Sequence, residues 1–332
     1  MAAPPSAGAE RNAAAPAARH RRRWRDERGT TLIPNRLRPW ATRQVDGAAR
    51  RLHRDQPHPL WLESPPSAAP GPRHGHGRPR HAQLEALLAR HADRYRAELE
   101  ATTGFADDLG RIGKRAAGVA DPFWLNRWLP PLDIVALYSF LRRRTPARYV
   151  EIGSGTSTAV AALARRDGRL STEITSIDPR PRRDVDALCD RVIRRPLELA
   201  DLALFQELEP GDVVFVDGSH RVFTNSDATV MLLDVLPSLP DGVLVGIHDV
   251  LWPDDYLPEW SQYWWSEQYL VGALLIGEPS WLTPVLACHY ASGRPDLMSV
   301  LDPLWAMPQV RGVHRWGCAL WLEIGRERKE PA

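Results

Sequence analysis

Residues 147–158 read ARYVEIGSGTST, and this stretch decides how the rest of the chain is interpreted. Tyr149, Val150 and Ile152 are apolar, and the acidic Glu151 interrupts them just before the glycines. This pattern is typical of a buried β-strand. The glycines at 153 and 155 suit a tight turn, and the hydroxyl side chains at 156–158 can cap a following helix. A strand, a glycine turn and a helix N-terminus together predict a nucleotide-type ligand site at the carboxyl end of a first β-strand.

The loop also restricts the class of ligand. A dinucleotide-binding loop would carry a third glycine where Thr158 stands, and a Walker loop would require Gly-Lys-Ser/Thr, which the sequence lacks. Glu151 would repel a pyrophosphate but suits a ligand with a cationic amino-acid end. The loop therefore disfavours a nicotinamide-dependent oxidoreductase, which is one alternative function. A noncatalytic cofactor-binding module is a second alternative function.

Composition indicates a soluble protein. The 332 residues are 43% hydrophobic and 25% charged, and no apolar run approaches the roughly 18 residues needed to span a membrane. The length suits one large domain and an extension. Three widely spaced cysteines, Cys189, Cys288 and Cys318, form no C-x-x-C pair. We therefore expect a reducing, cytoplasmic location.

Residues 1–80 are predicted to be a disordered arm rich in arginine, alanine and proline. The arm contains sixteen arginines and six acidic residues, a net charge of +10, whereas the whole chain has a net charge of +2. A basic arm can bind nucleic acid or an anionic membrane. Because Lys114 and Lys329 are the only lysines in the chain, a coding bias explains the arginine excess more simply. Nucleic acid is accordingly not an expected partner.

Residues 81–144 are predicted to form helices that pack on the following domain or cover it. Apolar residues share one helical face from His81 to about Glu100, and a second helix is expected over Leu132–Arg143. Three aromatic side chains are expected in the core: Trp124, Trp128 and Tyr138.

β and α segments alternate through residues 145–326, the sign of a doubly wound parallel sheet. A terminal hairpin added to five parallel strands makes seven strands, and residues 327–332 are left as a tail. After the first strand, the others are expected at 173–178, 192–194, 213–217, 242–249, 284–290 and 318–323.

Polar residues are expected at the carboxyl ends of these strands. Asp178, after the second strand, is placed to accept hydrogen bonds from ribose hydroxyls. Asp217, His248 and Asp249 end adjacent strands and can converge on a divalent cation. Alternatively, His220 or His248 acts as a general base without metal, or one histidine only hydrogen-bonds its loop.

Four motifs in order, VEIGSGTST, SIDP, LEPGDVVFVDGSH and LPDGVLVGIHDV, resemble class I S-adenosylmethionine-dependent methyltransferases. The likeness covers residues 120–325 and is greatest to the branch with an Asp-Gly-x-His loop after strand four and His-Asp after strand five. It implies a Rossmann-like α/β sheet in the order 3-2-1-4-5-7-6 with the last strand antiparallel. It also implies S-adenosylmethionine as cofactor and O-methylation of a hydroxylated small molecule, sugar or glycan. A homo-oligomer is a further expected possibility for the assembly of the chain.

The resemblance also assigns roles to residues. The cofactor residues that it implies are Glu151, Gly153, Ser154, Gly155, Thr158, Asp178 for the ribose, Glu198 or Asp201 for the adenine, and Asp217. Catechol-type O-methyltransferases place an acid after strand four and Asp-Asn after strand five. Here Asp217 and His248-Asp249 occupy those places, with histidine replacing the first of the pair, which implies a Mg²⁺ or Mn²⁺ site. The implied catalytic residues are His220, His248 and Asp249.

An aromatic segment follows the fifth strand. Its side chains are expected either to cover the acceptor, with Glu267 bonding acceptor hydroxyls, or to belong to a core helix with tryptophans at helical spacing. The acceptor contacts proposed from the sequence are Tyr256, Trp260, Glu267 and Tyr269.

Overall fold

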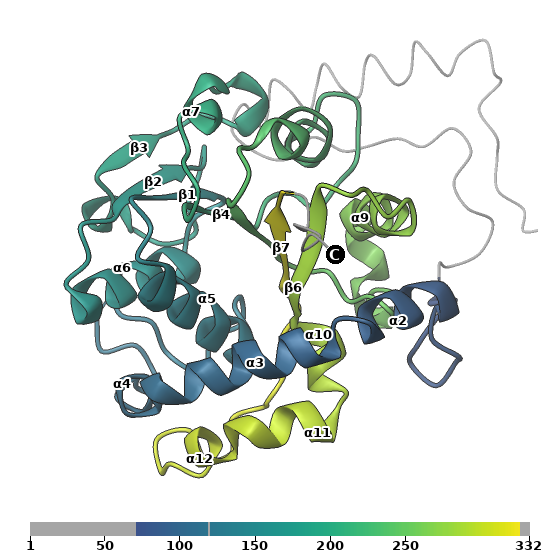
Figure 1. Cartoon of the computed structure of the whole chain (residues 1–332). Helices are drawn as coiled ribbons and strands as arrows, with labels where there is room; N and C mark the ends of the chain where they lie inside the picture. The colour runs from purple at the N-terminus through teal and green to yellow at the C-terminus, as the bar shows by residue number, and fades with distance from the viewer. Residues whose placement is uncertain (1–70, 119, 326–332) are drawn as a thin grey trace, which may run out of the picture. The chain divides into compact units, whose positions relative to one another are not determined.

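A computed structural model describes residues 71–118 and 120–325 of the chain (Figure 1). The first 70 residues of the expected arm and the tail at 327–332 lie outside the described residues. Over the described ranges, none of the helices combines the length and the apolar character that crossing a membrane requires.

The seven strands form one mixed sheet in the order β3-β2-β1-β4-β5-β7-β6. β7 is antiparallel to both of its neighbours, and the other strand pairs are parallel. The expected order and the antiparallel last strand are confirmed. The strands span Arg148–Ile152 (β1), Glu173–Ile177 (β2), Arg191–Ile193 (β3), Val213–Val216 (β4), Leu244–Ile247 (β5), Leu282–Ala287 (β6) and Leu320–Ile324 (β7).

The register of the parallel strands aligns their carboxyl ends. Ile152 pairs with Ile177 on one side and with Val216 on the other, and Val216 pairs with Ile247. Every residue of β4 and β5 is buried, as expected for a parallel sheet with helices on both faces. The residues that follow β1, β2, β4 and β5 therefore meet at one edge of the sheet.

The helices surround this sheet (Figure 1). α5 packs against α6, α3 packs against α5 and β6, and α2 packs against α9. The helices are α2 (Ala82–Ala89), α3 (Ala92–Thr102), α4 (Ala106–Gly110), α5 (Pro131–Arg144), α6 (Thr156–Gly168), α7 (Ala203–Gln206), α8 (Asp227–Val230), α9 (Glu267–Ile276), α10 (Cys288–Ser292), α11 (Pro295–Met298) and α12 (Asp302–Trp305).

Two details differ from the helices that the sequence predicts. The single helix expected from residue 81 to about 100 is interrupted at Arg90 and His91, so that α2 reaches α9 while α3 lies on β6. The helix expected after Ser226 begins as α8 but continues as a π-helical turn, Met231–Val235, and a 3-10 turn, Leu236–Ser238. The second change has a local cause, because Pro237 in the 3-10 turn has no backbone N–H to continue the α-helical hydrogen bonds.

The expectation that Trp128 is a core residue is wrong. Trp124 and Tyr138 are buried as predicted, but Trp128 is 51% exposed. The carboxamide oxygen of Asn126 accepts hydrogen bonds from the backbone N–H groups of Trp128 and Leu129, which makes a local turn. The exposed indole lies under the guanidinium of Arg182, 4.5 Å from the ring centroid, and this cation–π contact takes the place of core packing.

Candidate active site

The glycine turn after β1 lies directly against the end of β4. Gly153 has a φ of +81°, and a Cβ at this position would lie 1.8 Å from the carbonyl oxygen of Asp217. The backbone N–H of Asp217 donates to the carbonyl of Ile152 over 2.8 Å. Only glycine accommodates both the positive φ and the close approach, so the turn and Asp217 are held together.

Asp178 links the end of β2 to the same turn. One carboxylate oxygen accepts the backbone N–H of Ser154 at 2.7 Å, and the other accepts the N–H of Arg180 at 2.7 Å. The hydroxyl groups of Ser154 and Ser176 are hydrogen-bonded at 2.6 Å. A carboxylate offers about four lone-pair sites, so Asp178 retains acceptor capacity for a ligand.

Glu151 lies behind the turn and is fully buried. Its carboxyl group accepts a hydrogen bond from the hydroxyl of Tyr149 at 3.0 Å and another from the hydroxyl of Thr158. Burial raises the pKa of Glu151 to about 7, although hydrogen bonds from Ser157, Thr158 and Tyr149 act in the opposite direction. Glu151 directly precedes Ile152 and Gly153 in the chain, and its carboxyl group titrates near neutrality.

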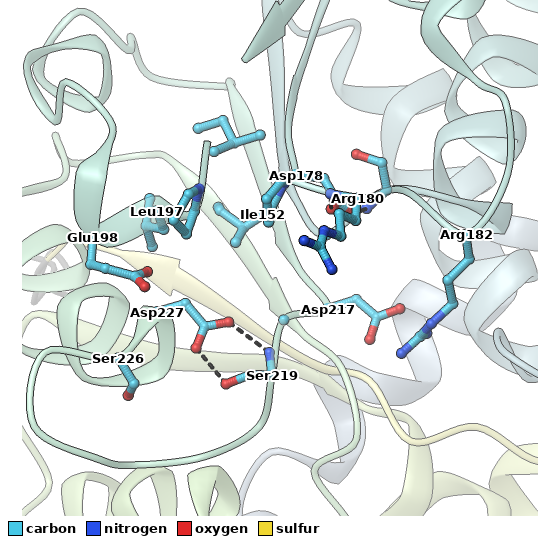
Figure 2. A pocket seen from close by; sticks show the side chains of 16 residues that line it. Ile152, Asp178, Arg180, Arg182, Leu197, Glu198, Asp217, Ser219, Ser226 and Asp227 are labelled. Carbon is cyan, nitrogen blue, oxygen red and sulfur yellow. Dashed lines mark hydrogen bonds between the residues drawn. The ribbon is translucent and has the colours of Figure 1, made fainter. Parts of the chain in front are cut away.

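A cavity of about 370 Å³ opens above the carboxyl ends of β1, β2 and β4 (Figure 2). Five of the cofactor residues expected from the sequence line it: Gly153, Ser154, Asp178, Glu198 and Asp217. The other expected residues are not among the lining residues: Glu151, Gly155, Thr158 and Asp201. Asp201 instead accepts the backbone N–H of Ala203 at 3.0 Å and is exposed.

Sequence reasoning missed five polar residues of the cavity wall: Arg180, Arg182, Ser219, Ser226 and Asp227. The two arginines belong to the run PRPRR that directly follows Asp178, so their position after a strand end was an available signal. Asp227 accepts the backbone N–H of Ser219 at 2.6 Å and its hydroxyl at 2.5 Å (Figure 2). It therefore fixes the loop 217–220.

A buried cluster of histidines and carboxylates adjoins the cavity, and we call it the histidine–carboxylate cluster. Its members come from α5, from the ends of β4 and β5, and from the start of α9: Asp133, Asp217, His220, His248, Asp249 and Glu267. Acidic side chains outnumber imidazoles in it by four to two. Because uncompensated buried charge is costly, this excess favours a bound cation.

His220 is held between three carboxylates. Its Nε2 lies 3.2 Å from an oxygen of Asp217 and 3.3 Å from one of Asp249. Its Nδ1 lies 2.9 Å from an oxygen of Glu267. Burial disfavours the charged imidazole, but the hydrogen bonds to Asp217 and Glu267 outweigh burial and raise the pKa of His220 to about 10. In the absence of a cation, His220 is therefore protonated at neutral pH.

His248 presents its two nitrogens to different surroundings. Nδ1 lies 3.5 Å from oxygens of both Asp217 and Asp249 and has no hydrogen-bond partner, although it is buried. Nε2 lies 3.4 Å from a carboxylate oxygen of Asp133 and 3.4 Å from the sulfur of Cys318. Burial alone would raise the pKa of Asp217 and Asp249, but the neighbouring charge of His248 lowers both.

The three side chains expected to bind metal are brought together. One ligand atom from each of Asp217, His248 and Asp249 lies within 4.8 Å of the others. Two carboxylate oxygens and an unpartnered imidazole nitrogen suit a divalent cation such as Mg²⁺ or Mn²⁺ with waters in the remaining positions. The residues present therefore fit the implied metal.

The aromatic segment after β5 lies beside this cluster, and its members differ in exposure. Tyr256 is buried and its hydroxyl accepts the backbone N–H of Gln268 at 3.1 Å, whereas Tyr269 is 46% exposed. Trp260 is partly buried and meets Trp265 edge-to-face, with the ring centroids 5.1 Å apart. Glu267, expected to bond acceptor hydroxyls, is buried against His220.

Residues 150–250 match a family model described as a methyltransferase domain. No curated protein matched the chain. This range contains the glycine turn, Asp178, the loop 217–220 and the end of β5, which are the strand ends that build the cavity and most of the cluster.

Solved structures with similar chains include three methyltransferases. A Podospora anserina methyltransferase bound to SAH is 19% identical, with 46% of this chain and 72% of that chain covered and a TM-score of 0.33. The O-methyltransferase TomG of Streptomyces achromogenes, involved in tomaymycin synthesis and solved with SAM, is 16% identical, with coverages of 57% and 78% and a TM-score of 0.33. An O-methyltransferase of Bacillus cereus in complex with SAH is 13% identical, with coverages of 69% and 91% and a TM-score of 0.36.

Proposed function

We propose that this chain methylates a hydroxyl oxygen. The matched domain and the sheet order support the enzyme class on which the proposal rests, a class I S-adenosylmethionine-dependent methyltransferase. The proposed acceptor is a hydroxylated small molecule, sugar or glycan, and a divalent cation assists. One observation carries the proposal. Asp217 lines the cofactor cavity and also lies 3.2 Å from His220 and 3.5 Å from His248. The methyl donor would thus lie next to the groups that bind and deprotonate a hydroxyl.

The cavity supplies contacts for the cofactor. Asp178, already held by two backbone N–H groups, would accept hydrogen bonds from the ribose hydroxyls. Glu198, which also lines the cavity, would meet the adenine (Figure 2). Gly153 and Ser154 would border the methionine and ribose end. The carboxyl group of Glu151 beneath them favours a cationic ligand over an anionic one.

Asp217, His248 and Asp249 would hold the cation. When bound there, a divalent cation lowers the pKa of a coordinated hydroxyl group and fixes its oxygen in place. The fit is supported by the unpartnered Nδ1 of His248 and by the excess of carboxylates over imidazoles in the cluster.

His220 is the proposed acceptor of the hydroxyl proton, in the state in which a bound cation offsets the carboxylate charges that otherwise keep its imidazole protonated. Glu267 holds its Nδ1 at 2.9 Å, so Nε2 faces the side of the cluster that contains Asp217 and Asp249. In the transfer, the acceptor oxygen forms a bond to the methyl carbon as the carbon–sulfur bond breaks. The demethylated thioether leaves, and the hydroxyl proton passes to Nε2 of His220. Alignment of the two reacting atoms supplies much of the acceleration.

The aromatic segment is the proposed acceptor surface. Trp265 lies 4.6 Å from the ring of His220, and Tyr256 and Trp260 continue the aromatic cluster away from it. Tyr269 is the most exposed of the four residues expected to contact the acceptor. Rings beside a hydrogen-bonding histidine suit a ligand that has both an apolar face and hydroxyl groups, as sugars and polyketide-like rings do.

Calorimetric titration tests the cofactor assignment. We expect S-adenosylmethionine and its demethylated product to bind to one site per chain, and NADH to give no heat. Binding of NADH without binding of S-adenosylmethionine would overturn the proposal and favour the oxidoreductase alternative. Binding of the cofactor without turnover of any hydroxylated acceptor would favour a noncatalytic module.

A further inference from the structure

Asp133 is a fully buried carboxylate in a mostly apolar part of α5. It lies in the first turn of α5, where every residue from Pro131 to Leu141 is buried. A lone acid in such a segment requires partners, because an unpaired buried charge is strongly unfavourable. The proposed cofactor site and the expected metal ligands leave this residue without a role.

The partners of Asp133 come from the segment that leads into β7. Its Oδ1 accepts the backbone N–H of Ala319 at 3.0 Å, and its Oδ2 accepts the N–H of Cys318 at 2.8 Å. These bonds join residues 185 and 186 positions apart and fix the carboxylate in one orientation. In that orientation Oδ2 lies 3.4 Å from Nε2 of His248.

His248 therefore has two contrasting sides. Nε2 faces an anchored carboxylate, and Nδ1 faces Asp217 and Asp249 at 3.5 Å with no hydrogen-bond partner. In a neutral imidazole, one nitrogen carries the proton and the other has a free lone pair. A carboxylate beside Nε2 favours the proton there and leaves the lone pair on Nδ1.

A second grouping of ligand atoms, from Asp133, His248 and Cys318, also lies within 4.8 Å. Both oxygens of Asp133 already accept backbone N–H groups, so this side of the imidazole is occupied by hydrogen bonds. The Asp217 side has the unpartnered nitrogen. The cation therefore belongs between Asp217, His248 and Asp249.

We propose that Asp133 is a positioning residue for this cation site. By accepting the Nε2–H of His248, it selects the tautomer and ring orientation that present the Nδ1 lone pair to the metal. Carboxylate groups behind metal-binding histidines act in this way in other proteins, and their loss typically weakens metal binding about 10–100-fold. The inference rests on the proposed metal-assisted function.

The test measures Mn²⁺ affinity of the full chain by electron paramagnetic resonance, without an acceptor. We expect Asp133→Asn to weaken Mn²⁺ binding about 10–100-fold. Asp212→Asn is the matched control, because Asp212 is also buried and accepts two backbone N–H groups, from Arg148 at 2.7 Å and Glu209 at 2.9 Å. Asp212 precedes β4 and so lies at the opposite end of that strand from the cluster, and its variant should bind Mn²⁺ as the wild type does.

A second measurement does not depend on a variant that folds. In ¹⁵N-histidine spectra of the wild-type protein loaded with Mg²⁺, His248 should carry its proton on Nε2. A proton on Nδ1 overturns the inference. Asp133→Glu, which restores a carboxylate, should recover part of the affinity that Asp133→Asn loses.

The outcomes separate this inference from the function on which it rests. If the wild type binds no Mn²⁺ at millimolar concentration, both the metal site and the role of Asp133 are wrong. If the wild type and Asp133→Asn bind Mn²⁺ equally, only the role of Asp133 is wrong. Equal weakening in Asp133→Asn and Asp212→Asn would indicate general destabilisation and would also overturn the inference.

Discussion

Gly153 and Asp217 are in contact through their backbones, and the contact leaves no room for a side chain at 153. A Cβ there would lie 1.8 Å from the carbonyl oxygen of Asp217. The contact connects the glycine turn of β1 to Asp217, which both lines the cavity above the strand ends and belongs to the histidine–carboxylate cluster. A change at residue 153 should therefore affect both.

Gly153→Ala should lower stability and cofactor affinity together. Overpacking against backbone costs about 1–3 kcal/mol, and a non-glycine residue at positive φ adds about 1 kcal/mol or more. Gly104→Ala is the control, because a Cβ at Gly104 meets nothing within 4 Å. Chemical denaturation and titration with S-adenosylmethionine measure the two effects. A Gly153→Ala protein that binds the cofactor normally would show that the turn can move away from Asp217.

Asp178→Ala should weaken S-adenosylmethionine binding by about 1–3 kcal/mol through lost charge-assisted hydrogen bonds. Thermal stability should change little, because the side chain ends a strand and is only partly buried. Asp201→Ala provides a control, since Asp201 is exposed and is not among the residues that line the cavity. Calorimetry measures both affinities, and an unchanged value for Asp178→Ala would mean that other residues hold the ribose.

Glu151 should make the folded state lose stability as pH rises. Its pKa is about 7 in the folded protein and about 4.5 in the unfolded chain. Its contribution is therefore fully present below about pH 4.5 and is lost as pH rises through 7. At about 1.4 kcal/mol per pH unit, the loss approaches roughly 3 kcal/mol.

Glu151→Gln resembles the neutral carboxyl group and removes this titration. Urea unfolding of both proteins at pH 5, 6, 7 and 8 should show the wild type losing stability relative to Glu151→Gln across the series. Parallel curves for the two proteins would contradict the elevated pKa. Other titrating groups cancel in this comparison because they are common to both chains.

Removal of the metal should separate cofactor binding from turnover. We expect chelator to abolish methyl transfer to a hydroxylated acceptor while S-adenosylmethionine affinity stays nearly constant, and Mg²⁺ or Mn²⁺ to restore transfer. Asp249→Ala should reproduce the effect of chelator by removing a ligand charge. Crystals soaked in Mn²⁺ supply a readout without an acceptor. Turnover unaffected by chelator would favour a histidine base acting without metal.

Truncation at two positions should give different results. Residues 73–80 contact the loop after β5, where Asp255 accepts the backbone N–H groups of Arg73 at 2.5 Å and His74 at 3.0 Å. Arg80 also pairs with Asp254 at 3.3 Å. We expect removal of residues 1–70 to leave stability unchanged, and removal of 1–80 to give a folded protein that is about 1–3 kcal/mol less stable. Thermal denaturation measures the difference, and equal stability of the two truncated proteins would show that these contacts contribute nothing.

The sequence alone determined the strand, glycine turn and helix at 147–158, the sheet order through its resemblance, and which residues end each strand. The strand, the turn and the helix follow from local periodicity and turn chemistry, which neighbouring residues in the chain encode, whereas the sheet order came from the resemblance. Because parallel strands end at one edge of a sheet, the convergence of Asp217, His248 and Asp249 was also predictable.

Only the tertiary structure decided which side chains pack around those residues. Trp128 has the same apolar character as Trp124, yet it is exposed because a local turn directs it to Arg182. Asp133 lies next to His248 because α5, β5 and the segment before β7 meet in the core. Such contacts join residues far apart in the chain, and their geometry is set by how whole elements pack rather than by any local pattern.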